Sequence, residues 1–116
     1  MKLLIAGSRT IDQFDLSQYI TKDVDLIISG GACGIDLLAE KYADDHRISK
    51  LIMRPKYHVY GKAAPILRNH EMVDLADRVL VVWDGVSRGT KDTIAYAKQQ
   101  QKEIEVVIYV VPKTGK

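Results

Sequence analysis

The chain has 116 residues, 47% of them hydrophobic and 28% charged, with a formal net charge of +2. This composition is typical of one globular domain with a buried core, and the small charge excludes a strongly basic nucleic-acid or membrane-surface protein. One cysteine, Cys33, excludes an internal disulfide bond, and a cytoplasmic location is expected. We expect a single domain over residues 1–111, followed by a flexible tail at 112–116.

The amino-terminal half begins with the apolar run Lys2–Ala6, which predicts a strand. A short helical pattern over Asp15–Thr21 follows, and the apolar run Asp25–Ser29 predicts a second strand. From Gly34 to about His46, apolar residues recur at the spacing of a helix with one buried face.

Strands and helices are then expected in turn over Lys50–Arg54, Pro65–Ala76, Arg78–Trp83, Thr90–Gln101 and Glu105–Val111. The predicted strands are apolar almost throughout, which is typical of parallel strands covered on both faces. Alternating strands and helices predict an α/β fold. We expect a single Rossmann-like, doubly wound parallel sheet of five strands in the order 3-2-1-4-5.

Glycine-rich turns follow three of the predicted strands, at the sheet edge where ligands bind in such folds. Such turns bring backbone N–H groups close to a phosphate, and the positive end of the next helix attracts it. The alternative is that the glycines serve only the backbone geometry of tight turns. A Walker loop and a GxGxxG fingerprint are both lacking, which excludes those nucleotide-binding classes. The turns are Gly7-Ser8-Arg9, Ser29-Gly30-Gly31-Ala32-Cys33-Gly34-Ile35-Asp36 and Asp84-Gly85-Val86-Ser87-Arg88-Gly89-Thr90.

These turns, together with three further segments, resemble the SLOG superfamily, in particular its small YspA-like branch, from Lys2 to Val111. The further segments are Tyr60-Gly61-Lys62-Ala63-Ala64, Arg68-Asn69-x-x-Met72 and Ala76-Asp77. Relatives in that superfamily include the LOG-type cytokinin-activating phosphoribohydrolases and the DNA-processing protein A. The resemblance implies a Rossmann-like fold that binds a nucleotide or a nucleotide derivative.

The catalytic residues of the LOG-type enzymes are matched only in part. Arg68 and Met72 keep one spacing, but Thr93 stands where those enzymes have a glutamate. Cleavage of a glycosidic bond needs a positioned carboxylate. Asp36 and Asp84 are the candidates for that role, together with Arg68, so the presence of an enzyme activity stays open.

Three functions follow as alternatives: a nucleotide-ligand sensor, a nucleoside-monophosphate N-glycosidic hydrolase, or a single-stranded nucleic-acid binder. The last is disfavoured by the net charge of +2 and the aromatic content of 7%. The expected ligand-binding residues are Gly7, Ser8, Arg9, Ser29, Gly30, Gly31, Ala32, Gly34, Asp36, Arg68, Asn69, Gly85, Ser87, Gly89 and Thr90.

The expected partners are a nucleotide-derived small molecule and a second copy of the chain, with no membrane, nucleic acid, metal or cofactor. The three histidines lack metal-ligand spacing with each other or with Cys33. A homodimer is expected because the segment Tyr57–Ala76 has apolar residues on more than one face of its helix.

Overall fold

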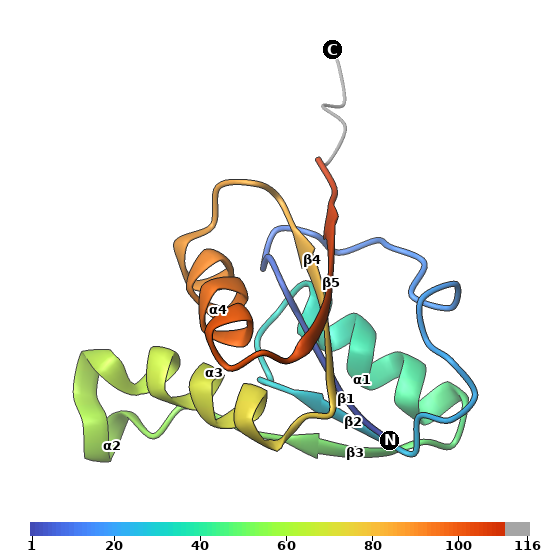
Figure 1. The fold of residues 1–116 in the computed structure, drawn as a ribbon, viewed down its shortest axis with the longest axis horizontal. Helices are drawn as coiled ribbons and strands as arrows, with labels where there is room; N and C mark the ends of the chain where they lie inside the picture. Colours follow the sequence, from blue (N-terminus) through green and yellow to red (C-terminus); the bar gives the residue numbers. More distant parts are fainter. Residues whose placement is uncertain (111–116) are drawn as a thin grey trace.

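A parallel sheet of five strands organises residues 1–110, the part of the chain that the computed structural model describes (Figure 1). Its order is β3-β2-β1-β4-β5, and neighbouring strands pair in parallel. The expected α/β class, five-strand sheet and strand order are therefore confirmed. The strands are β1 (Lys2–Gly7), β2 (Leu26–Ser29), β3 (Ser49–Ile52), β4 (Arg78–Trp83) and β5 (Glu103–Ile108).

Helices cover both faces of the sheet. Helix α1 (Ile35–Asp45) lies on one face, and α3 (Ala64–Leu75) and α4 (Arg88–Gln99) lie together on the other (Figure 1). A short helix α2 (Tyr57–Tyr60) and the 3₁₀ turn η1 (Gly61–Ala63) lead into α3. Within residues 1–110, no helix has the length and apolar composition that crossing a bilayer requires.

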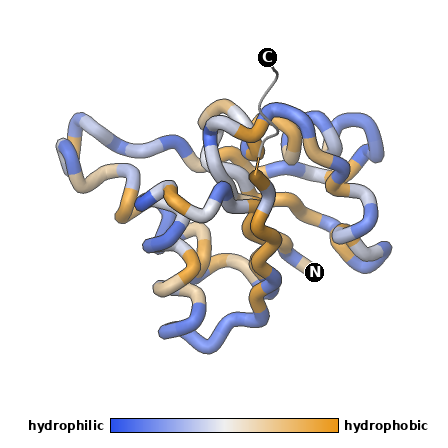
Figure 2. The backbone as a smooth tube through the Cα atoms, turned by 90° about the horizontal axis from the view of Figure 1, so that it is seen from above, coloured by the Kyte–Doolittle hydropathy of each residue, from blue (hydrophilic) through white to orange (hydrophobic). Residues whose placement is uncertain are grey.

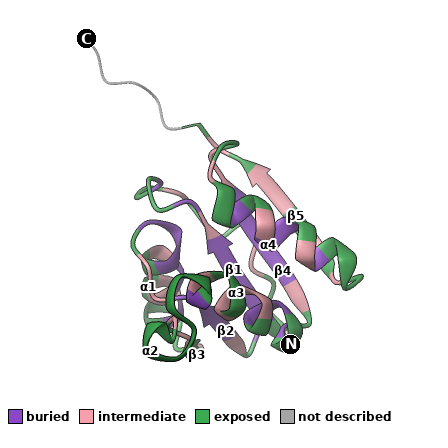
Figure 3. Ribbon diagram, turned by 90° about the vertical axis from the view of Figure 1, so that its left-hand side faces the viewer, coloured by how far each residue is buried: buried purple, intermediate pink, exposed green. Residues whose placement is uncertain are grey.

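The central strands separate two hydrophobic cores. Because side chains alternate along a strand, Leu3 and Ile5 of β1 pack in the core that contains α1. Leu4 and Ala6 pack in the core that contains residues of α3 and α4. Figures 2 and 3 show hydrophobic, buried strands at the centre of the molecule. Burial on both faces explains why β1 and β4 read as continuous apolar runs.

The edge strands differ from this pattern. Three of the four residues of β3 are exposed, and residues of β5 alternate between exposed and half-buried along much of its length. These two edge strands are therefore covered less completely than the central ones. Val107 of β5 still packs against the core that contains α1, and Ile104 and Val106 pack against the other core. Arg54 lies beyond the end of β3, and β5 ends at Ile108. Val111 and the predicted tail at 112–116 lie outside the described residues.

The helix predicted over Asp15–Thr21 is absent, and the segment forms turns instead. The Asp15 carboxylate accepts hydrogen bonds from the Ser17 backbone N–H at 3.0 Å and from its hydroxyl at 2.6 Å. Such local side-chain bonds compete with helical hydrogen bonding. The loop still contributes to the α1 core through the buried side chains of Ile11 and Leu16.

The segment from α2 into α3 exposes several large apolar side chains. They belong to Tyr57, Val59, Tyr60, Ile66 and Leu67. In Figure 3 helix α2 is coloured almost entirely as exposed. This is the segment for which the sequence predicts a contact with a second copy, and the homodimer stays a prediction.

Candidate functional site

A cavity of about 940 Å³ opens at the carboxyl edge of the sheet. Its volume lies near the upper end of the roughly 300–1,000 Å³ typical of small-molecule sites. The turns after β1, β2 and β4, the segment after β3 and one side of α3 form its walls. The sequence-based choice of this edge therefore agrees with the position of the cavity.

Most of the expected ligand-binding residues meet at this cavity. Those that line it are Gly7, Arg9, Gly30, Gly31, Ala32, Asp36, Arg68, Asn69, Ser87, Gly89 and Thr90. Outside its lining are Ser8, Ser29, Gly34 and Gly85, and so is the catalytic candidate Asp84. Arg88 lies in one of the predicted phosphate-binding turns and also lines the cavity. The other lining residues outside the expected set are Ala6, Thr10, Arg54, Pro55, Tyr57, Pro65, Met72 and Thr93.

Gly34 serves the geometry of the turn rather than the cavity. Its φ of 74° and ψ of −129° are not readily adopted by other residues. A Cβ atom there would lie 2.5 Å from the Ser8 carbonyl oxygen. The alternative interpretation of the glycine-rich turn, tight backbone packing, therefore applies at this position.

Asp84 organises the loop that precedes α4. Its carboxylate accepts backbone hydrogen bonds from Val86 at 2.9 Å and Ser87 at 2.8 Å, and a third from the Ser87 hydroxyl at 2.8 Å. The two backbone bonds, above all, lower the pKa of Asp84 to about 2 and keep it ionised. Its backbone N–H donates to the Ser8 hydroxyl at 2.9 Å. Asp84 and Ser8 therefore hold this loop in place next to the cavity, although neither residue lines it.

The amino-terminal end of α4 is left uncapped at the cavity. Because the Ser87 hydroxyl bonds to Asp84, it does not cap the helix. Within residues 1–110, the backbone N–H groups of Arg88, Gly89 and Thr90 have no hydrogen-bond partner. Such groups, with the helix dipole, form a ready anion site.

Thr90 adds an unsatisfied hydroxyl at the same place. The residue is only 8% exposed and lines the cavity. Among the described residues its hydroxyl makes no hydrogen bond, yet it is not sealed from solvent. Since Thr90 lines the cavity, its free hydroxyl is available to a ligand bound there. The neighbouring Thr93 differs, because its hydroxyl donates to the Gly89 carbonyl oxygen at 3.1 Å.

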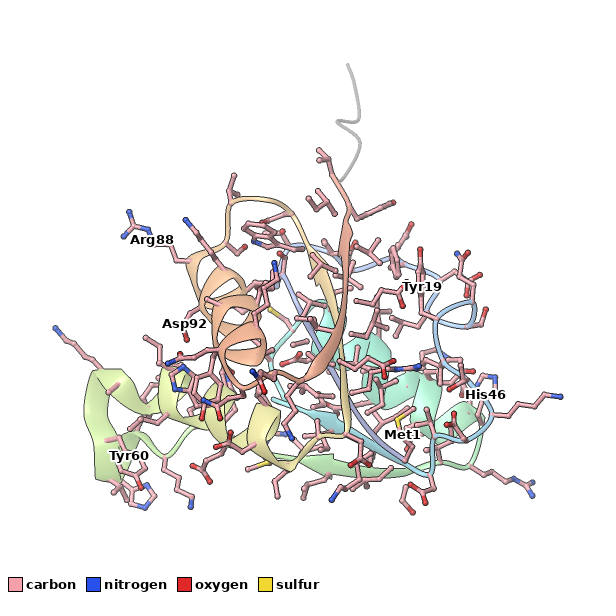
Figure 4. All side chains as sticks on the ribbon, viewed as in Figure 1. Met1, Tyr19, His46, Tyr60, Arg88 and Asp92 are labelled. Atoms are coloured by element: carbon pink, nitrogen blue, oxygen red, sulfur yellow. The ribbon has the colours of Figure 1, made fainter. Side chains whose placement is uncertain are left out.

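The lining is strongly cationic. It contains four arginines, Arg9, Arg54, Arg68 and Arg88, and a single carboxylate, that of Asp36. Figure 4 shows the exposed Arg88 side chain projecting outward from the start of α4. None of the ion pairs within residues 1–110 involves any of these arginines. The charges of Arg9, Arg54 and Arg88 are therefore free to act on a ligand, whereas the charge of Arg68 also acts on Asp36.

Arg68 ties α3 to the ends of two strands at the cavity floor. Its Nη1 donates to the carbonyl oxygens of Gly30 at 2.6 Å and Met53 at 3.1 Å. Its Nε donates to the Asn69 side-chain oxygen at 2.8 Å. Since Gly30 and Met53 follow β2 and β3, this one guanidinium fixes the relative positions of three elements.

Asp36 lies beside this guanidinium and is only 7% exposed. Burial raises the pKa of Asp36 to about 6, although the Ala32 N–H, 3.1 Å away, and the charge of Arg68 both lower it. A Cβ at Gly30 would lie 2.8 Å from Arg68 Nη1 and 2.9 Å from Asp36 Oδ2. The absence of a side chain at Gly30 lets both groups approach the same point.

Within residues 1–110, no group of three or more histidine, cysteine or acidic residues is placed to hold a metal ion. Comparison of the chain with protein-family models, with curated proteins and with solved structures gives no match.

Proposed function

We propose that the cavity binds a nucleotide or a nucleotide-derived ligand through phosphate, and that the chain acts as a ligand-binding or sensor domain. The observation that supports this best is the uncapped start of α4, where Thr90, with a free hydroxyl, lines the cavity. Backbone N–H groups, a hydroxyl and nearby arginines are the donors that phosphate oxygens need. The resemblance of the sequence to the SLOG superfamily points to the same ligand class.

The rest of the lining suits a nucleoside. Ala6, Pro65, Met72 and Tyr57 supply apolar and aromatic surface for a base. Asn69 and Asp36 supply polar groups for ribose hydroxyls, as does the backbone around Gly30.

Replacing Arg88 by glutamine tests the phosphate site. We expect the variant to bind AMP roughly tenfold more weakly, since a charge-assisted hydrogen bond contributes about 1.5–3 kcal/mol and Arg88 is exposed at the rim. The matched control is Lys91→Gln, which removes the same charge from an exposed site in α4 that does not line the cavity. Isothermal titration calorimetry measures both. Equal losses in the two variants would show that only overall charge matters.

Asp36 supports a second candidate, hydrolysis of a nucleotide N-glycosidic bond. A cavity carboxyl with a pKa of about 6 can give and take protons near neutral pH. In this reaction water adds to the ribose C1′, the bond from C1′ to the base breaks, and the base leaves with a proton. Arg68 would position Asp36, whereas Asp84 lies outside the lining and takes no part.

Release of free adenine from AMP, followed by chromatography, tests this candidate. We expect slow turnover, because Thr93 supplies no carboxylate, and a loss of about 100-fold in Asp36→Asn with AMP binding retained. The exposed Asp12→Asn change is the control. If wild-type protein binds AMP but releases no adenine, the hydrolase is rejected and the binding function stands.

A further inference from the structure

We infer, building on the proposed nucleotide site, that the ligand has at least two phosphate groups, one held at the start of α4 and the other by Arg54. The two phosphates are attached to opposite sides of the nucleoside, because two directly linked phosphates lie too close together to reach both regions. The argument depends on where the arginines lie and on how much charge the cavity holds.

The two anchoring regions lie on opposite sides of the cavity. Arg54 follows β3, and Arg88 is the first residue of α4, the helix that follows β4. Strands β2 and β1 separate β3 from β4 in the sheet. At a spacing of about 4.8 Å between neighbouring strands, the two regions start roughly 14 Å apart. A single phosphate at the start of α4 therefore leaves Arg54 without an anion.

The charge of the cavity exceeds what one phosphate compensates. Four arginines against one aspartate give the lining a formal charge of +3. The whole chain has +2, so the residues outside the lining sum to −1. A phosphate monoester contributes about −1.5 to −2 at pH 7. Positive charge is thus concentrated in the cavity, and the ionised Asp84 carboxylate behind the start of α4 offsets part of it there. Arg54, on the other side, is the cation that a second phosphate would neutralise.

Arg54 is placed for this role but is not satisfied by the protein. Its Nη1 donates to the Gly31 carbonyl oxygen at 3.1 Å, which holds the guanidinium over the turn after β2. The side chain is exposed, and within residues 1–110 no carboxylate lies in ion-pair range of it. A guanidinium has five N–H donors, so most of them stay available to an anion.

Titration calorimetry with AMP, ADP and adenosine 3′,5′-bisphosphate at fixed ionic strength tests this inference. We expect the bisphosphate to bind at least tenfold more tightly than AMP, and ADP to gain little over AMP. If ADP binds more tightly than the bisphosphate, the placement of the second phosphate at Arg54 is refuted. Arg54→Gln should remove most of this advantage. Lys22→Gln should preserve it, because Lys22 is exposed and precedes β2, at the opposite end of the strands from the cavity.

The outcomes separate the two proposals. If all three nucleotides bind with equal affinity, the second phosphate site is refuted and the nucleotide site stands. The inference is also refuted if Arg54→Gln still binds the bisphosphate more tightly than AMP by the wild-type factor. The melting temperature of the variant must first show that it is folded. If none of the three binds to the wild-type chain, the proposed function itself fails and the inference fails with it.

Discussion

Asparagine in place of Asp36 is expected to raise the free energy of unfolding at pH 8 by about 2–3 kcal/mol. Burial raises the pKa of this carboxyl from 3.8 to about 6, and each pKa unit corresponds to about 1.4 kcal/mol. The ionised carboxylate therefore destabilises the folded chain at neutral and alkaline pH. Its favourable position in the first turn of α1 contributes only about 0.3–1 kcal/mol, which is less than the effect of burial.

The pH dependence follows from the direction of the shift. Near pH 4 and below, the carboxyl is largely protonated in the folded chain, and variant and wild type should differ little in stability. Between about pH 4 and pH 6 the folded wild type keeps a proton that the unfolded chain has lost, so its stability falls as the pH rises. Above about pH 6 the difference between variant and wild type becomes constant.

Urea unfolding of both proteins at pH 4 and pH 8 measures this difference. Asp12→Asn is the matched control, since Asp12 is exposed and its replacement should change stability by no more than about 0.5 kcal/mol at either pH. If Asp36→Asn is no more stable than wild type at pH 8, burial does not govern this carboxyl. A destabilising carboxyl at a cavity floor is typical of a residue that serves a ligand.

The sequence predicted the fold because its strongest signals were local. Central strands such as β4 are buried on both faces, and their long apolar runs show it directly. At the edges the same signal is weaker, and the predicted strand Lys50–Arg54 ran two residues past the observed end at Ile52. The helix predicted over Asp15–Thr21 was wrong, because the Asp15 carboxylate accepts local hydrogen bonds from Ser17 that compete with helical ones.

The site was predicted where it depends on strand ends and missed where it depends on helix placement. The turns after β1, β2 and β4 supplied most of the lining, by the rule for parallel sheets. Arg54 was missed because the predicted strand Lys50–Arg54 included it. With the correct end of β3 at Ile52, Arg54 follows the strand and would have been counted among the residues at the ligand-binding edge. Pro65 and Met72 reach the cavity only through the way α3 packs, which no local pattern reveals.

Methionine in place of Arg68 is expected to lower the free energy of unfolding by about 2–4 kcal/mol at pH 7. Methionine keeps the apolar stem but removes the donors to the Gly30 and Met53 carbonyl oxygens. Hydrogen bonds from a charged donor contribute about 1.5–3 kcal/mol each, and part of this is regained through water because Arg68 is only half-buried. The matched control is Arg54→Met. Arg54 is exposed and donates to the carbonyl oxygen of Gly31, which follows Gly30 in the chain, so this variant's free energy of unfolding should fall by less than about 1 kcal/mol.

The Arg68 and Asp36 changes should not be additive. Loss of the guanidinium removes the positive charge that lowers the pKa of Asp36, so the carboxylate becomes still less favourable. In the Asp36→Asn background no such carboxylate remains, and Arg68→Met should be less destabilising by about 0.5–2 kcal/mol, within the range found for coupled neighbours. Urea unfolding of the two single variants and the double variant completes the cycle. Strict additivity would show that Arg68 acts only through the backbone carbonyls it binds.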